Sequence, residues 1–311
     1  MRMLLTIPIL ILAGLAVFSF VSKPGMPQQY AFISGATPVL QAAQAYLLPL
    51  SDPAYAPVRD TTVAGPQPDA NAALVYHLES GRMLYEKNAT VQVPVASLTK
   101  LLSALVVAES FDLSEVVTIS SGSVRVDGQK QTLYAGERIF VTDLMSMMLV
   151  ESSNDAAYAL AAYAQWQGID FVAKMNQKAA ELGMQDCRFT DPAGLDDNAF
   201  CTARDVLRLV KSALKTAPQL WPLMAQSQLS VRSADGKIIH EVKSTDELLG
   251  QIPGIVGGKT GYTDGALGCL ILVVKLSGKD DTLISVVLGS RSRFADTKEL
   301  VSWAQRAYRW Q

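Results

Sequence analysis

The chain is poor in the residues from which most metal sites are built. Its 311 residues include only two histidines, His77 and His240, and three cysteines, Cys187, Cys201 and Cys269. The histidines lie far apart, and no two cysteines have CxxC spacing. Zinc sites usually show paired cysteine or histidine ligands at short spacing. The sequence therefore predicts no metal site and no cofactor, and both histidines are expected to be structural.

An excess of basic charge is also lacking. The 27 lysines and arginines are balanced by 29 acidic residues, for a formal net charge of -2, and no basic stripe or arm is present. A nucleic-acid partner therefore has no electrostatic support. Hydrophobic residues make up 49% and charged residues 18%, a mixture typical of a globular chain with a sizeable core.

The N-terminus predicts export from the cytoplasm. Residues 3–21 form an uncharged, largely apolar run behind Arg2, long enough to cross a bilayer as a helix. The positive charge at Arg2 favours the inner side, which places the rest of the chain outside. We expect residues 1–21 to be an uncleaved membrane anchor. The alternative is a cleaved signal peptide, although the small-residue sequence Ser34-Gly35-Ala36 lies far downstream.

Residues 22–70 are predicted to be a linker, because eight of the fourteen prolines fall there. Proline removes a backbone N–H donor and stiffens the chain, which suits a spacer.

Residues 71–311 are predicted to be one catalytic domain. Its pattern predicts a strand pair, a long helical middle, further strands and a last helix. Strands are expected at 73–76, 83–85, 230–232, 238–242, 258–263, 267–275 and 282–288. Helices are expected at 97–109, 142–150, 154–163, 170–182, 202–215 and 295–309.

This order indicates an α+β fold. The N- and C-terminal strands can share one antiparallel sheet with flanking helices, while the helical middle forms a separate all-helical lobe, with a cleft between them.

The first of three short motifs is Ser97-Leu98-Thr99-Lys100, at the start of a predicted helix. Residues three apart share a helix face, so the Lys100 amine can reach the Ser97 hydroxyl. A serine hydroxyl becomes a good nucleophile when a neighbouring base takes its proton. Lysine can be that base if burial or a second cation lowers its pKa.

The second motif, Ser152-Ser153-Asn154, lies between two predicted helices. The Ser152 hydroxyl is suited to relay a proton to a leaving amine. The Asn154 amide is suited to orient Lys100 and to bind a substrate carbonyl.

The third motif, Lys259-Thr260-Gly261, lies in a predicted edge strand along which an extended peptide could bind. Lys259 would supply the second cation, Thr260 would hold a terminal carboxylate, and Gly261 would let the substrate approach the backbone. Each motif alone is common, but their joint occurrence in this order is the motif set of β-lactamases and penicillin-binding proteins.

With these motifs, residues 70–309 closely resemble the low-molecular-mass penicillin-binding proteins, the serine D-Ala-D-Ala carboxypeptidases of peptidase family S11. The family has the β-lactamase/DD-peptidase-like fold. The resembling segments are 93–101, 148–157, 181–184, 191–196, 202–205, 258–263 and 287–294.

The resemblance implies an enzyme that acylates Ser97 with Lys100 as base, and that hydrolyses peptidoglycan stem peptides ending in D-Ala-D-Ala. Water would then hydrolyse the acyl-enzyme, and penicillins would inhibit the enzyme. It also implies a bacterial cell-membrane protein with its catalytic domain outside the cytoplasm. Its implied site residues are Ser97, Lys100, Ser152, Asn154, Lys259, Thr260, Gly261, Tyr262 and Arg293, with the backbone N–H groups of Ser97 and Tyr262 as the oxyanion hole.

Alternatives remain open at this point. An endopeptidase acting on cross-linked peptides would use the same motifs. A serine β-lactamase would need a water-activating glutamate, and the 191–198 loop has none. A non-enzymatic wall-binding protein is disfavoured because Ser97, Lys100 and Lys259 are all present. The turn 244–249, Ser-Thr-Asp-Glu-Leu-Leu, departs from the asparagine-rich turn frequent in the family, which leaves its contact with the third motif in doubt.

The cysteines leave two possibilities. Cys187 and Cys201 flank the 191–197 loop, and in an oxidising compartment they could form a disulfide or remain as two buried thiols. Cys269 lies in an apolar strand and is expected to be a small core residue.

Overall fold

A five-stranded antiparallel sheet places the third motif at one edge. The computed structural model describes residues 56–126, 132–276 and 280–310. The strand order is β10-β11-β12-β2-β3, so strands from both ends of the chain share one sheet, as predicted. The bounds are Ile255–Thr263 for β10, Leu267–Lys275 for β11, Thr282–Ser290 for β12, Ala72–His77 for β2 and Arg82–Lys87 for β3.

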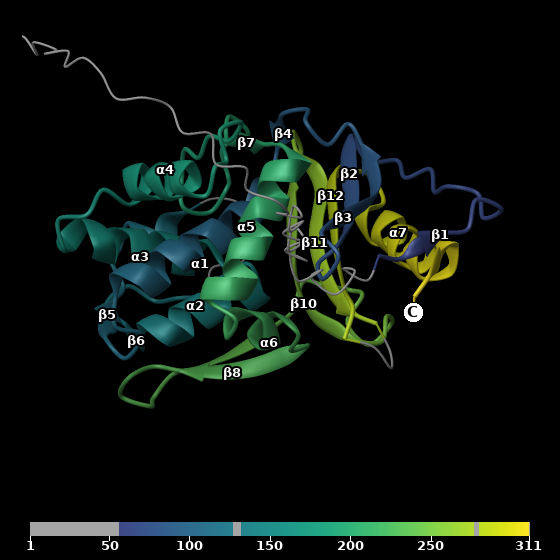
Figure 1. The fold of residues 1–311 in the computed structure, drawn as a ribbon. Coiled ribbons are helices and arrows are strands. Elements are labelled where there is room, and N and C mark those ends of the chain that lie inside the picture. Colours follow the sequence, from purple (N-terminus) through teal and green to yellow (C-terminus); the bar gives the residue numbers. More distant parts are fainter. Residues whose placement is uncertain (1–55, 127–131, 277–279, 311) are drawn as a thin grey trace, which may run out of the picture. The chain divides into compact units, whose positions relative to one another are not determined.

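Both faces of this sheet are covered, and for that reason its central strands are apolar at almost every position. In β2, Leu74 faces the helical lobe, whereas Val75 packs against the last helix, α7 (Arg293–Ala307). Such continuous apolar runs are typical of strands that are buried on both sides. Figure 1 shows α7 on one side of the sheet and the other helices on the opposite side.

The helical lobe contains the first two motifs. The 3-10 turn η1 (Ala96–Leu98) leads into α1, and α2 leads into α3. The helix bounds are Thr99–Ser110 for α1, Val141–Val150 for α2, Asn154–Trp166 for α3, Phe171–Glu181 for α4, Ala203–Thr216 for α5 and Leu220–Met224 for α6. Thr202 caps α5, because its side chain accepts the backbone N–H of Asp205.

Four strand pairs lie outside the main sheet or at its margins. The strands β8 (Gln228–Arg232) and β9 (Ile239–Lys243) form a hairpin of their own, so the expectation that these segments join the main sheet was wrong. Their alternation of exposed and buried residues fits a ribbon with one covered face. The other pairs are β4 (Val93–Pro94) with β7 (Phe200–Cys201), β5 (Val116–Thr118) with β6 (Arg138–Phe140), and β1 (Val58–Arg59) with β13 (Tyr308–Arg309).

Several helix bounds differ from the prediction: α3 runs to Trp166 instead of residue 163, and residues 97 and 98 belong to the 3-10 turn η1 instead of α1. The last helix ends at Ala307 instead of residue 309, because Tyr308 and Arg309 pair with β1. The short helix α6 was not predicted, and its central Pro222 explains why the pattern did not suggest a helix.

The predicted anchor, residues 1–21, and most of the predicted linker lie outside the described residues. Within the described part of that linker, β1 pairs with β13 and Ala70 is buried against α7. No helix in the described parts of the chain has the length and apolar character to cross a bilayer.

Candidate active site

Ser97 lies in the 3-10 turn that precedes α1, with its side chain largely buried. The preceding residue, Ala96, has a positive φ of 47°, a conformation that is costly for a residue with a side chain. Such strain persists where the surrounding contacts fix the backbone, and β4, which ends two residues before Ala96, is held by its pairing with β7. The nucleophile candidate is therefore on a rigid turn.

The Lys100 amine is held by three oxygen atoms. Its Nζ lies 2.7 Å from Ser97 Oγ, 2.8 Å from Asn154 Oδ1 and 2.8 Å from the carbonyl oxygen of Ala193. The amide and carbonyl oxygens can only accept hydrogen bonds. A neutral amine donates its two hydrogens to these two oxygens, and its lone pair then faces the Ser97 hydroxyl. This arrangement is suited to a base that takes the hydroxyl proton.

The surroundings of Lys100 favour that neutral form. The side chain is fully buried, and burial lowers its pKa well below the ordinary value. The positive charge of Lys259 lowers the pKa further, while Asp191 opposes the shift. Burial and the charge of Lys259 thus give Lys100 the lowered pKa that a base for Ser97 requires.

The carbonyl of Ala193 was not anticipated from the sequence. It is presented by a loop that folds around Asp191, whose carboxylate accepts four backbone N–H bonds from residues 193–196 at 2.7–3.0 Å. Gly194 follows with a φ of +73°, and a Cβ there would lie 2.0 Å from the Ala96 carbonyl oxygen. Only glycine fits this contact between the loop and the nucleophile turn.

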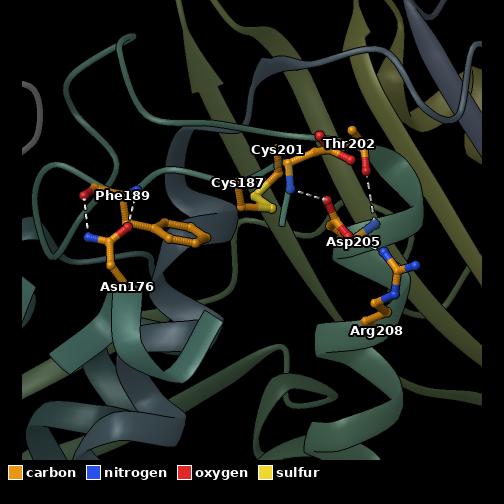
Figure 2. Close-up of a disulfide and its surroundings, with 8 residues drawn as sticks. Asn176, Cys187, Phe189, Cys201, Thr202, Asp205 and Arg208 are labelled. Carbon is orange, nitrogen blue, oxygen red and sulfur yellow. Dashed lines mark hydrogen bonds and ion pairs between the residues drawn. A yellow bond between two sulfur atoms is a disulfide. The ribbon is translucent and has the colours of Figure 1, made fainter. Parts of the chain in front are cut away.

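A disulfide closes this loop. Cys187 and Cys201 are joined by the bond shown in Figure 2. Cys187 lies in the segment between α4 and β7, and Cys201 lies in β7, shortly before α5. Beside it, the Asn176 amide makes hydrogen bonds with both the N–H and the C=O of Phe189, at 3.0 and 2.8 Å. Residues 187–201, including Ala193, are therefore fixed at both ends.

The second motif begins at a sharp turn. Ser152 has a φ of 63°, and Ser153 then caps α3 by accepting the backbone N–H of Ala156. This turn directs the Ser152 hydroxyl to Lys259 Nζ, which lies 2.8 Å away. Asn154, in the first turn of α3, faces Lys100 as described above.

Lys259 connects the sheet to the helical lobe. It is 1% exposed, and its Nζ also donates to the Thr260 carbonyl at 2.8 Å. Burial lowers its pKa to about 7, with the negative charge of Asp246 opposing the shift and Arg293 adding to it. Ordinary lysines remain charged to far higher pH.

The edge strand passes close to the nucleophile. A Cβ at Gly261 would lie 3.1 Å from the Ser97 backbone nitrogen, which shows how closely β10 approaches η1. The Thr260 hydroxyl lies 2.5 Å from that of Thr245, a residue of the 244–249 turn that sequence reasoning did not single out. The unusual turn therefore does contact the third motif.

Tyr262 and Arg293 lie beside one another at the end of β10. The Tyr262 side chain is 57% exposed, and the Arg293 guanidinium lies 6.0 Å from the centre of its ring. Their roles in substrate binding, and that of the Tyr262 N–H in an oxyanion hole, stay predictions.

The remaining titratable candidates lie apart from these contacts. His240 Nε2 is 2.6 Å from Glu137, and both side chains are buried. One set of potential metal ligands occurs among the described residues: His77, Glu79 and Asp281, with ligand atoms within 4.8 Å of one another. The His77 Nε2 lies 3.0 Å from an Asp281 oxygen and 3.1 Å from a Glu79 oxygen, and its Nδ1 lies 2.6 Å from the Ser80 hydroxyl. Cys269 is a buried thiol in the core.

Comparisons with known proteins identify the family. Residues 59–292 match the model of the Peptidase S11 family, described as D-alanyl-D-alanine carboxypeptidase. The chain is similar to D-alanyl-D-alanine carboxypeptidase DacC of Escherichia coli, with 30% identity over 86% of this chain and 69% of the relative. It is also similar to the D-alanyl-D-alanine endopeptidase of Pseudomonas aeruginosa, with 31% identity over 76% of this chain and 77% of the relative.

A solved structure shares the fold. Penicillin-binding protein D2 of Listeria monocytogenes, in its cefotaxime-bound form, has a TM-score of 0.66 and 32% identity over 78% of this chain and 99% of that chain.

Proposed function

Because the chain belongs to the Peptidase S11 family of D-alanyl-D-alanine carboxypeptidases, we propose that it removes the terminal D-alanine from peptidoglycan stem peptides through an acyl-enzyme on Ser97. It is a hydrolase whose fold is that of the penicillin-binding proteins. The β-lactam in the similar Listeria structure supports β-lactam binding by this chain as part of the proposal.

Acylation begins with Lys100 in its neutral form. Ser97 gives its hydroxyl proton to Lys100 Nζ while Oγ attacks the carbonyl carbon of the penultimate D-alanine. Asn154 and Ala193 hold the amine so that its lone pair stays directed at the hydroxyl. General-base help of this kind contributes roughly 10²–10⁴-fold to the rate.

Release of D-alanine needs a proton on its nitrogen. Ser152, whose hydroxyl contacts Lys259 Nζ, delivers its own proton to the D-alanine nitrogen. The proton that Lys100 took from Ser97 then passes to Ser152, so Lys100 becomes neutral again and Lys259 stays charged. The C–N bond breaks and an ester of Ser97 remains. A water molecule then attacks this ester with Lys100 again as base, which restores the Ser97 hydroxyl and frees the shortened peptide.

The contact of Lys100 with Ser97, Asn154 and Ala193 is the single observation that carries this proposal. The test is intact-mass analysis after incubation with benzylpenicillin, followed by mapping of the modified peptide. We expect one adduct on Ser97, and release of D-alanine from a peptide ending in D-Ala-D-Ala. A Ser97→Ala protein that still took up the penicillin would overturn the assignment, and rapid turnover of a chromogenic β-lactam would point to a β-lactamase.

An endopeptidase activity is the second candidate, because one of the similar proteins is named as an endopeptidase. The same serine would attack a D-alanyl bond whose leaving group is the side-chain amine of a second stem peptide. Purified cross-linked dimers and linear pentapeptides, given in competition to one enzyme sample, distinguish the two activities by their relative kcat/KM values.

The proposal includes a place for the protein outside the cytoplasm, on the bacterial cell membrane. The apolar run of residues 3–21 behind Arg2 supports it, and the Cys187–Cys201 disulfide suits an oxidising compartment. Membrane fractionation with N-terminal sequencing tests it: an anchored protein keeps residues 1–21, and an exported, cleaved one has lost them.

A further inference from the structure

The turn 244–249 places a buried carboxylate beneath the third motif. Asp246 is 6% exposed, and its Oδ1 accepts the backbone N–H of Leu248 at 2.9 Å. Its Oδ2 is buried and has no hydrogen-bond partner among the described residues. Burial of a carboxylate with one unpaired oxygen is costly unless nearby positive charge compensates it. The positively charged groups near Asp246 therefore indicate its function.

Asp246 lies against the backbone of β10, one residue before Lys259. A Cβ at Gly258 would lie 2.8 Å from Asp246 Oδ2 and 3.1 Å from a methyl group of Leu272, which belongs to the side of the sheet facing α7. The Lys259 side chain points the other way, to Ser152 in the helical lobe. The carboxylate and the Lys259 amine therefore lie on opposite faces of the strand.

The charges facing Asp246 come from three elements. They are Lys259 of β10 and Arg293 of α7, which lower its pKa, and Glu247 of its own turn, which raises it; burial is the largest influence and also raises it. The effect on Lys259 is reciprocal. Burial lowers the pKa of Lys259 to about 7, Asp246 raises it, and Arg293 lowers it.

The proposed mechanism needs the two buried lysines in opposite charge states. Lys100 must be neutral to take the Ser97 proton. The resemblance to the family implies that Lys259, together with Thr260, binds the terminal carboxylate of the substrate, and for that role Lys259 must be charged. Burial favours the neutral form of both side chains. A negative charge near Lys259 breaks this symmetry.

We propose that Asp246 is a positioning residue whose buried carboxylate keeps Lys259 in the charged form that binds the substrate carboxylate. The inference rests on the proposed function. An asparagine at this position could accept the same Leu248 N–H, but it would carry no charge, so the charge itself can be tested.

The experiment compares Asp246→Asn with Glu247→Gln, which removes the same charge from the neighbouring, exposed residue. We would measure KM and kcat for a D-Ala-D-Ala peptide, and the rate constant of acylation by a fluorescent penicillin, from pH 5.5 to 9. Lys259 must be protonated, so activity falls as the pH rises through its pKa. Without the carboxylate this fall moves to lower pH by about one unit, a roughly tenfold rise in KM at pH 8.

At pH 5.5, where most of Lys259 is charged in every variant, Asp246→Asn should come close to the unmodified protein, and Asp246→Glu should restore the alkaline side of the profile. A purely structural role would lower activity evenly at all pH values. That result, or an equal shift in Glu247→Gln, would overturn the inference. Asp246→Ser gives a second neutral side chain if the asparagine variant folds poorly. Failure of the unmodified protein to be acylated at any pH would instead contradict the proposed function.

Discussion

At the scale of single residues, the lone pair of Lys100 determines whether Ser97 can react. Arginine keeps a positive charge at this position but cannot release its proton at neutral pH. We predict that Lys100→Arg lowers the acylation rate by roughly 10²-fold or more, because the general base is lost. Stopped-flow measurement with a fluorescent penicillin checks this.

The matched control is Lys215→Arg, an exposed lysine in the last turn of α5, which should react at the normal rate. Thermal unfolding would establish that the Lys100→Arg protein is folded. Acylation of that folded variant at the normal rate would show that the Ser97 proton leaves by another route.

A second residue-scale prediction concerns Thr245, whose hydroxyl lies 2.5 Å from that of Thr260. Valine has the same shape but no hydroxyl, so Thr245→Val leaves the Thr260 hydroxyl without this partner. We expect KM for a D-Ala-D-Ala peptide to rise roughly fivefold, equivalent to a hydrogen bond of about 1 kcal/mol, with kcat nearly unchanged. Steady-state kinetics measure both constants.

Thr245→Ser is the conservative control, since it keeps the hydroxyl and should retain a normal KM. A fall in kcat with unchanged KM in the valine variant would place Thr245 in the acylation step instead of in substrate binding.

The sequence could predict those site residues whose side chains form a motif. Ser97, Lys100 and Asn154 share one group of hydrogen bonds, and Ser152 and Lys259 share another. It could not predict the Ala193 carbonyl, because a backbone oxygen has no residue type of its own. Asp191 and Asp246 were missed for a related reason: an aspartate in a turn is ordinary until its burial is known.

At the scale of elements, the loop 187–201 is the part of the site whose position depends on a covalent bond. The disulfide joins residues 14 apart in sequence, and closing a loop of this size in the unfolded chain stabilises the fold by about 3 kcal/mol. The same loop presents the Ala193 carbonyl to Lys100. The bond should therefore contribute both to stability and to the position of the base.

We predict that replacing both Cys187 and Cys201 by serine lowers the free energy of unfolding by about 3 kcal/mol and slows acylation by roughly tenfold. Urea unfolding and penicillin labelling measure the two effects. The control is Cys269→Ser, which lies outside the loop and leaves the disulfide intact. Normal acylation in the double variant would show that the Asp191 hydrogen bonds alone hold the loop.

The element pattern was predictable where burial left a clear signal in the sequence: a continuous apolar run in strands buried on both faces, and a helical period in helices buried on one face. The sheet strands and the helices α1 to α5 follow that pattern. Partner choice was harder to predict: β8 and β9 read as sheet strands but pair only with each other. The pairing of β1 with β13 joins Val58 and Arg309, which are 251 positions apart, and two-residue strands leave no period to detect.

At the scale of the whole molecule, the site exists because residues from two lobes converge. The helical lobe supplies Ser97 and Lys100, the sheet supplies Lys259, and both lysines are fully buried where the two parts meet. Burial of ionisable groups opposes folding, so the molecule gives up stability at neutral pH to hold this site.

The pH dependence of stability follows from these two lysines. In the folded protein their pKa values lie below the ordinary 10.5, well below for Lys100 and at about 7 for Lys259. Above pH 7, the unfolded chain therefore binds more protons than the folded chain, so the free energy of unfolding rises with pH. Each excess proton contributes about 1.4 kcal/mol per pH unit. Cys269 has a folded pKa raised from 9.0 to about 11 and opposes this trend only near and above pH 9.

We therefore predict that the free energy of unfolding rises between about pH 7.5 and 8.5, and that Lys100→Met makes this rise smaller by about 1.4 kcal/mol per pH unit. Methionine fills a similar volume and cannot be protonated, so one of the two proton differences disappears. Urea titrations at both pH values measure the slope, and Lys215→Met, at an exposed site, should leave it unchanged. A slope that Lys100→Met does not alter would mean that Lys100 keeps its proton in the folded protein, and it could then not be the base for Ser97.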